Sequence, residues 1–123
     1  PLLLSWQVLP CQSKVPRIAI NNGFCFAGNA ALFGCADFKI ATRDSWIGMA
    51  GPAMIEGGGL GTFEPTDIGP AVMQESNGVI DILAENEEQA TQLAKQLLSY
   101  FQGATSSWSA ADQELLRNII PKD

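Results

Sequence analysis

The chain has 123 residues, the length of one typical domain, and 46% of these residues are apolar whereas only 16% are charged. This balance favours a globular protein with a hydrophobic core over a disordered or fibrous one. The sequence contains no histidine. That absence excludes serine and cysteine triads that use histidine, histidine-ligated zinc and imidazole acid–base catalysis.

Charge is distributed unevenly along the chain. Residues 1–63 carry four basic and three acidic side chains, whereas residues 64–123 carry three basic and ten acidic ones. The acidic second half would repel a polyanion, so we expect no nucleic-acid partner. No apolar run approaches the roughly 20 residues that a membrane span needs, and we expect no membrane association.

The cysteines are Cys11, Cys25 and Cys35, an odd number without a CxxC pair. We interpret them as reduced core residues of a protein in a reducing compartment. We also expect no metal bound by this chain. The sequence begins with proline rather than methionine, which we interpret as the start of a processed, truncated or excised piece.

The first predicted unit is a βαβ unit that follows a segment of uncertain form. Residues 17–20 are typical of a buried strand, and Asn21-Asn22-Gly23 is typical of a turn. The alanine-rich segment that follows predicts a helix beginning at Gly28 or Asn29, and residues 38–42 predict a second strand. This order predicts parallel pairing through a right-handed crossover.

Six glycines lie between Gly48 and Gly61, around residues 52–56, which predict one turn of helix. The favoured explanation is a structural loop that needs positive φ, and the alternative is close approach of the backbone to a ligand or a neighbouring chain. The spacing matches neither GxGxxG nor GxxxxGK[ST], which excludes a nucleotide-binding loop of either kind.

The second half predicts a helical turn over residues 64–69, a third strand over residues 78–84 and a long helix capped by Asn86. Gln89 stands at the capping-box position. Gly103 ends this helix, and a polar linker and a last helix over residues 110–120 follow. Six apolar residues at helical spacing predict one buried helix face: Ala90, Leu93, Ala94, Leu97, Leu98 and Phe101.

The strongest candidate site is the strand-to-helix turn Ala27-Gly28-Asn29-Ala30. The first amides of a helix are free to donate hydrogen bonds, and glycine lets a carbonyl oxygen approach them. Two such amides directed at one oxygen would form an oxyanion hole. Two alternatives remain open from the residues alone: Gly28 serves helix packing, and Asn29 is a simple N-cap.

At this turn the sequence becomes similar to a known family. Residues 15–121 resemble the carboxyltransferase components of acetyl-CoA and propionyl-CoA carboxylases, within the crotonase superfamily. The motifs that carry the resemblance are residues 15–20, Phe26-Ala27-Gly28-Asn29-Ala30-Ala31-Leu32, residues 40–61, residues 76–81, the acidic helix ending at Tyr100, and Ile119-Ile120-Pro121.

The resemblance implies an α/β fold, a crotonase-like (ClpP/crotonase) spiral of ββα-type units that is present as a partial domain. Residues 1–103 would form the C-terminal half of an N-terminal carboxyltransferase domain. Residues 104–123 would form a linker and a short helix that lead to an absent second domain.

The implied function is transfer of CO₂ from carboxybiotin to the α-carbon of a short acyl-CoA, acetyl-CoA or propionyl-CoA. The family's paired glycine amides match Gly28 and Asn29, which are therefore the candidate catalytic residues through their backbone N–H groups. Asn29 replaces the second glycine and crowds the pocket, but a backbone donor survives this substitution. The candidate substrate-binding residues are Phe26, Ala27, Ala30, Gly57 and Gly58.

The resemblance further implies biotin as the cofactor, held on a carrier domain. The implied partners are the acyl-CoA substrate, the biotin carboxyl carrier and biotin carboxylase components, the rest of the carboxyltransferase, and further copies in a homo-oligomer. The implied location is the cytoplasm, or the mitochondrial matrix in a eukaryote. The fragment alone would be inactive.

Two alternative functions are also compatible with the sequence. The first is a non-catalytic crotonase-like structural or interaction protein that has lost CoA binding. The second is a hydratase or isomerase, for which Glu56 is the one candidate acid near the glycines. Lys14, Arg17, Lys39 and Arg43 could bind CoA phosphates, although solvated surface charge is the favoured explanation.

Overall fold

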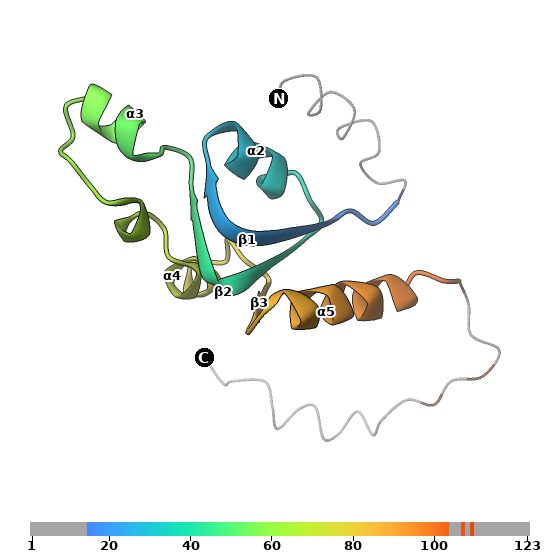
Figure 1. The fold of residues 1–123 in the computed structure, drawn as a ribbon. Helices are drawn as coiled ribbons and strands as arrows, with labels where there is room; N and C mark the ends of the chain where they lie inside the picture. Colours follow the sequence, from blue (N-terminus) through green and yellow to red (C-terminus); the bar gives the residue numbers. More distant parts are fainter. Residues whose placement is uncertain (1–14, 104–106, 108, 110–123) are drawn as a thin grey trace, which may run out of the picture.

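A computed structural model describes residues 15–103, 107 and 109, and it shows a parallel sheet with helices on both faces (Figure 1). The strand order is β1-β2-β3, and β2 pairs in parallel with both neighbours. The predicted α/β class and the predicted parallel βαβ unit are confirmed. The strands are β1 (Ile18–Phe26), β2 (Phe38–Gly48) and β3 (Ile82–Ala84), and the helices are α2 (Gly28–Gly34), α3 (Pro52–Gly57), α4 (Ala71–Ser76) and α5 (Glu87–Ser99), with a 3₁₀ turn η2 (Pro65–Asp67).

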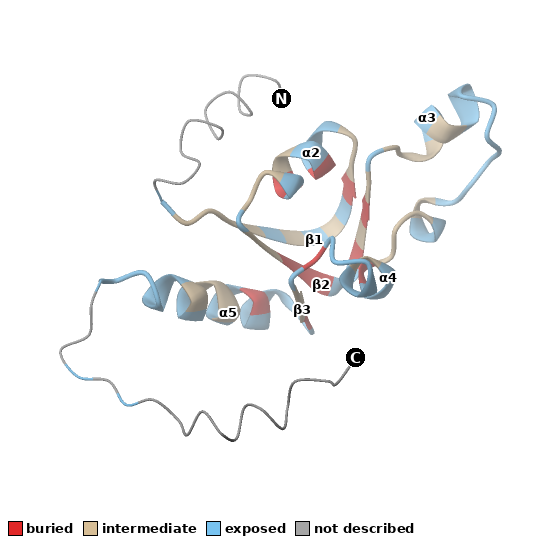
Figure 2. Ribbon diagram, turned by 180° about the vertical axis from the view of Figure 1, so that it is seen from behind, coloured by how far each residue is buried: buried red, intermediate tan, exposed pale blue. Residues whose placement is uncertain are grey.

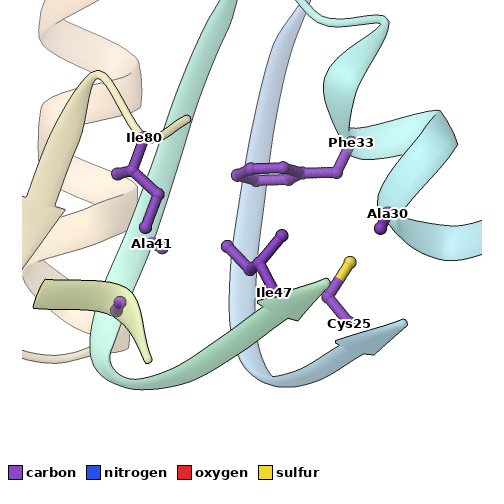
Figure 3. Close-up of a cluster of buried hydrophobic side chains, with 7 residues drawn as sticks. Cys25, Ala30, Phe33, Ala41, Ile47 and Ile80 are labelled. Atoms are coloured by element: carbon purple, nitrogen blue, oxygen red, sulfur yellow. The ribbon is translucent and has the colours of Figure 1, made fainter. Parts of the chain in front are cut away.

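Alternate residues of the strands contribute side chains to two hydrophobic clusters on opposite faces of the sheet. On the α5 face, Ile40 and Ala84 pack with Ala90. On the other face, buried residues of the strands and of α2 and α4 form the larger cluster, which Figure 3 shows with the Phe33 ring beside Ile47. Figure 2 shows that buried residues concentrate in the sheet and in the helix turns that face it. The core therefore lies in two thin layers on either side of β2.

The predicted turn at Asn21-Asn22-Gly23 is wrong, because these residues lie inside β1. The register changes between them: Asn21 pairs with Ala41, but Gly23 pairs with Ser45, so β2 holds two additional residues at this point. Gly23 has a φ of 86°, a conformation that suits glycine in a bulge. Residues typical of a turn thus bend two strands that continue to Phe26 and Gly48.

Hydrogen bonds from buried polar side chains stabilise this bend. Thr42 and Ser45 are 2% and 0% exposed, and their hydroxyl oxygens lie 3.0 Å apart. The Thr42 hydroxyl donates to Oδ1 of Asn22 at 2.7 Å, and the Ser45 hydroxyl donates to the Asn21 carbonyl at 3.2 Å. These hydrogen bonds join the bend in β2 to Asn21 and Asn22 of β1. The far halves of β1 and β2 are thereby held in a fixed direction.

The glycine-rich segment agrees in part with the prediction of a structural loop. α3 supplies the predicted helical turn, and Gly59 and Gly61 have φ values of 71° and 110°. Gly51 and Gly58, in contrast, have φ values of −86° and −82°, which other residues adopt as well. Within this segment, a positive φ that favours glycine is therefore confined to Gly59 and Gly61.

Two elements between residues 69 and 84 differ from the prediction. α4 was missed, since a single proline and a six-residue helix give little pattern to detect. The third strand is shorter than predicted, because the amides of Val79 and Ile80 both donate to the carbonyl of Gln74 and close the end of α4. Only Ile82–Ala84 joins the sheet.

The start of α5 agrees with its sequence. Oδ1 of Asn86 accepts a hydrogen bond from the amide of Gln89 at 2.9 Å, whereas Oε1 of Gln89 accepts one from the amide of Glu85 at 2.6 Å. The predicted buried face holds through Leu97, but Leu98 and Phe101 are 44% and 52% exposed. α5 therefore covers the sheet with its first three turns.

We expect Asn86→Ala to lower the free energy of unfolding by about 1 kcal/mol, because it removes the N-cap acceptor of α5. Urea denaturation monitored by circular dichroism measures this loss. Lys95→Ala, at an exposed position within the same helix, is the control and should change stability by less than about 0.5 kcal/mol. Equal effects of the two substitutions would contradict the capping role.

Ion pairs engage three of the four basic residues considered for CoA phosphates. Arg17 pairs with Asp37 at 2.9 Å, Lys39 with Asp81 at 2.9 Å, and Arg43 with Glu85 at 2.7 Å. The Arg17 guanidinium contacts both carboxylate oxygens of Asp37, and the amides of residues 37 and 38 donate to the Arg17 carbonyl. This clasp joins the start of β1 to the start of β2. Lys14 lies outside the described residues.

Hydrogen bonds from Arg17 hold the pKa of Asp37 below its ordinary value. A carboxyl with a lowered pKa in the folded state adds stability above its unfolded pKa, and this stability is lost as pH falls through the folded pKa. We therefore expect Asp37→Asn to be less stable than the unmodified protein at pH 7, and the difference to shrink below about pH 4. Urea midpoints from pH 7 to pH 3 test this, with the exposed Asp44→Asn as control; a difference that does not depend on pH would contradict it.

The two described cysteines are free. Cys25 is buried, as predicted, and burial raises the pKa of its thiol, whereas Cys35 is half-buried. No helix among the described residues is long and apolar enough to cross a bilayer. Cys11, the linker at residues 104–106 and the predicted helix at residues 110–120 lie outside the described residues.

Candidate functional site

The candidate site is the turn between β1 and α2, where Ala27 adopts a strained backbone. Ala27 has φ 52° and ψ −120°, and it is the one non-glycine residue with positive φ in the described part of the chain. Such a conformation costs on the order of 1–3 kcal/mol and persists only where its surroundings impose it. The amide of Ala27 donates to the Gly48 carbonyl at 3.1 Å. The end of β2 therefore holds the turn in place.

The turn leaves the first amides of α2 available. The first helical hydrogen bond runs from the amide of Ala31 to the carbonyl of Ala27 at 3.0 Å, and no side chain caps the helix. The amides of Gly28 and Asn29 precede this bond, and both residues are exposed. Asn29 is the second helical residue, so the explanation of Asn29 as an N-cap is wrong.

The structure gathers three of the five predicted substrate-binding residues at this turn. Phe26 ends β1 and Ala27 forms the turn, whereas Ala30 is buried in the first turn of α2. Gly57 and Gly58 are not brought there. They end α3, which stands apart from the sheet in Figure 1, and they are exposed, as is Glu56.

A pocket of about 300 Å³ adjoins α2 on the side of the larger hydrophobic cluster. Its walls come from α2, both ends of β2, α4 and the loop after α4. The lining residues are Ala30, Phe33, Gly34, Lys39, Ile47, Gly48, Met49, Gln74 and Val79. Of these, only Ala30 was a predicted site residue. Ala30 and Phe33 stand three residues apart in the segment predicted to be a helix, and this spacing could have placed them on one face. Nothing in the sequence pointed to Gln74 or Val79, because α4 was not predicted.

Contacts from the segment before α4 and from α4 itself fix the end of β2. The amide of Ile47 donates to the Gly69 carbonyl at 2.8 Å, and Nε2 of Gln74 donates to the Ile47 carbonyl at 2.5 Å. Trp46 and Pro70 form an antiparallel bridge beside them. Because Gly48 in turn holds Ala27, these contacts extend to the β1–α2 turn.

The arrangement suits stabilisation of a negatively charged oxygen by backbone donors. Donors fixed before the reaction need no reorganisation when charge develops on a substrate oxygen. Within the described residues, no three His, Cys, Asp or Glu side chains lie close enough together to hold a metal ion. The site offers the amides of two exposed residues, Gly28 and Asn29, next to an apolar pocket.

The parallel sheet, the crossover helix and the strained turn at its start define part of one crotonase-like domain. The chain belongs to the carboxyl transferase domain family, whose sequence profile matches residues 7–123. A comparison with curated proteins found no match.

Solved structures of carboxylases and transcarboxylases are similar to this chain. A single-chain, multi-domain long-chain acyl-CoA carboxylase is 49% identical, with a TM-score of 0.78 over 94% of this chain and 12% of its own. Transcarboxylase 12S is 26% identical, with a TM-score of 0.71 over 98% of this chain and 26% of its own. The β subunit of geranyl-CoA carboxylase from P. aeruginosa, 24% identical with a TM-score of 0.59 over 76% of this chain and 18% of its own, shares the fold. The chain thus spans no more than about a quarter of the length of these three relatives.

Proposed function

We propose that this chain forms part of the carboxyltransferase of a biotin-dependent acyl-CoA carboxylase, which moves CO₂ from carboxybiotin to the α-carbon of an acyl-CoA. The observation that carries the proposal is the pair of uncapped amides of the exposed residues Gly28 and Asn29, which follow a strained turn in a member of the carboxyl transferase domain family. A short acyl group, acetyl or propionyl, is the sequence-based prediction. The long-chain acyl-CoA carboxylase at 49% identity favours a longer chain.

In this function the two amides would donate to the thioester carbonyl oxygen of the acyl-CoA. Negative charge would develop on that oxygen as a base from outside the described residues takes the α-proton, and the amides would lower the energy of the resulting enolate. Each such donor is worth about 10²–10³ in rate. Backbone donors need no imidazole, in keeping with a sequence that has no histidine.

The pocket beside α2 does not suit the polar ureido ring of biotin. Its walls are chiefly apolar, and its two long polar side chains are engaged, Lys39 with Asp81 and Nε2 of Gln74 with the Ile47 carbonyl. We therefore assign no step through biotin to these residues. Carboxybiotin would supply the CO₂, held on a carrier domain and bound by other parts of the carboxyltransferase.

The partners that we propose follow from this role. They are a biotin carboxylase, a biotin carboxyl carrier, the remainder of the carboxyltransferase and further copies of the same protein; transcarboxylase 12S is described as a hexamer. Because Arg17, Lys39 and Arg43 are engaged in ion pairs, the contacts with CoA phosphates would come from elsewhere. Residues 1–103 would complete an N-terminal domain and residues 104–123 would lead into a second domain, in the cytoplasm or mitochondrial matrix.

The test is carboxylation by the assembled carboxylase that contains these residues. Radiolabelled bicarbonate, ATP and a series of acyl-CoA thioesters are supplied, and fixed radioactivity that depends on acyl-CoA and is abolished by avidin is expected. Absence of fixation with every thioester, in an assembly whose biotin is carboxylated, would favour the non-catalytic alternative.

A further inference from the structure

The sequence contains two Asn-Gly pairs, Asn22-Gly23 in β1 and Asn77-Gly78 directly after α4. An asparagine followed by glycine is prone to lose ammonia, because glycine has no side chain to obstruct attack by its own amide nitrogen on the asparagine side chain. The attack requires the asparagine side chain and the following peptide to rotate toward each other. The surroundings of each pair therefore decide whether it reacts.

The surroundings of the first pair prevent this rotation. Oδ1 of Asn22 accepts a hydrogen bond from the Thr42 hydroxyl at 2.7 Å, and Nδ2 of Asn22 donates to Oε1 of Glu87 in α5. The backbone of both residues belongs to β1, where Gly23 pairs with Ser45 of β2. Rotation at Asn22 would require the two strands to separate. The sheet therefore protects this pair.

The second pair lies at the exposed end of α4. Asn77 caps the helix with φ −84° and ψ −3°, and Gly78 has a φ of 75°. Both residues are exposed, and no described residue forms a hydrogen bond with the Asn77 side chain. The Gly78 amide donates to the Glu75 carbonyl at 3.0 Å, within the last turn of a six-residue helix. Terminal turns of this kind open at a low cost in free energy.

We propose that Asn77 is a site of spontaneous deamidation, and that isoaspartate formed there loosens the hold of Gln74 on the end of β2. The Gly78 nitrogen attacks Cγ of Asn77, the new C–N bond closes a succinimide ring, and the side-chain nitrogen leaves as ammonia with the proton of the Gly78 amide. Water then attacks one of the two ring carbonyl carbons and breaks its bond to the Gly78 nitrogen, which takes up a proton. Breakage at the side-chain carbonyl gives aspartate, and breakage at the backbone carbonyl gives isoaspartate. No atom changes its oxidation state, and water is the co-reactant.

Isoaspartate inserts an additional carbon atom into the backbone at position 77. This position lies inside the loop that is closed by the amides of Val79 and Ile80, which donate to the Gln74 carbonyl at 2.9 and 3.2 Å. Deamidation also adds a negative charge at the C-terminal end of α4, where the helix dipole disfavours it. Nε2 of Gln74 donates to the Ile47 carbonyl at 2.5 Å. A disturbed end of α4 therefore weakens the contact that fixes the end of β2.

Peptide mapping of the assembled carboxylase tests the modification. The protein is aged in mildly alkaline buffer at physiological temperature, and trypsin places the two pairs in different peptides, residues 18–39 and 44–95. Loss of ammonia and gain of water at Asn77 should be at least about tenfold faster than at Asn22, a factor that corresponds to about 1.4 kcal/mol in the free energy of opening. In protein unfolded in guanidinium chloride the two rates should be similar, because the protection of Asn22 comes from the fold.

Hydrogen exchange tests the link to β2. The Ile47 amide donates to the Gly69 carbonyl at 2.8 Å, so its exchange rate reports how firmly the end of this strand is held. Exchange at Ile47 should be faster in the aged, isoaspartate-containing protein than in fresh protein. Asn77→Gln, aged in parallel, is the matched control. It should show no change, because glutamine would have to close a larger ring and reacts far more slowly.

Each part of the inference has its own contrary result. Conversion at Asn77 no faster than at Asn22 in the native assembly would overturn the modification site. Conversion at Asn77 with unchanged exchange at Ile47 would overturn the effect on Gln74, as would equally faster exchange in aged Asn77→Gln. Neither measurement depends on catalysis, so this inference and the proposed function can fail separately.

Discussion

Gly28→Val is expected to lower kcat/KM for carboxyl transfer by about 10²-fold or more in the assembled carboxylase. Gly28 is the first residue of α2 and is exposed next to the strained Ala27. A branched side chain there obstructs the approach of a carbonyl oxygen to the amides of residues 28 and 29. The loss should appear in kcat/KM for every acyl-CoA, because the thioester carbonyl is common to all of them.

Two further variants serve as controls for Gly28→Val. Ala31→Val places the same side chain one turn later, on an exposed part of α2. It should leave kcat/KM unchanged, because it does not obstruct the two amides. Asn29→Ala removes a side-chain amide but keeps the backbone donor, so its loss should be far smaller than that of Gly28→Val. Full activity in a folded Gly28→Val protein would refute the assignment of the oxyanion hole.

Gly69→Ala is expected to destabilise the protein by about 3 kcal/mol or more. Gly69 has a φ of 58°, and a Cβ added there would lie 2.0 Å from the Ile47 carbonyl oxygen and 2.8 Å from Nε2 of Gln74. Neither the backbone of β2 nor the bonded amide can move away without breaking the contacts that fix the end of this strand. The substitution therefore disrupts the local fold and the hold on Ala27 together.

Thermal and urea unfolding of the same polypeptide measure this effect. Gly34→Ala is the matched control, since its added Cβ meets nothing within 4 Å and alanine favours a helix over glycine by up to about 1 kcal/mol. The two glycine-to-alanine changes should thus have opposite signs. A Gly69→Ala protein as stable as the unmodified one would show that the contacts around Ile47 are not as tight as the structure has them.

Local patterns predicted the elements whose sequence signals are strong. The apolar spacing from Ala90 to Leu97 and the cap at Asn86 predicted α5, and the β-branched run at Ile18 predicted the start of β1. The start of α2 followed from a glycine after a strand. Each of these signals depends on neighbours in the sequence, so no knowledge of the tertiary structure was needed.

The sequence could not predict features that depend on distant contacts. Asn21-Asn22-Gly23 has the composition of a turn, and only its pairing with Ala41 and Ser45 makes it a bulge. α4 owes its place to the contact of Gln74 with Ile47 rather than to its own periodicity. The pocket combines α2, β2 and α4, and so its residues could not be grouped before these elements were positioned.

Ala27 has a consequence for any effort to make the protein more robust. The residue with an unfavourable backbone is also the one that presents the two amides. A change that relaxed this backbone would gain stability at the point where the donors need to stay fixed. At this residue, stability and the proposed oxyanion role are therefore opposed.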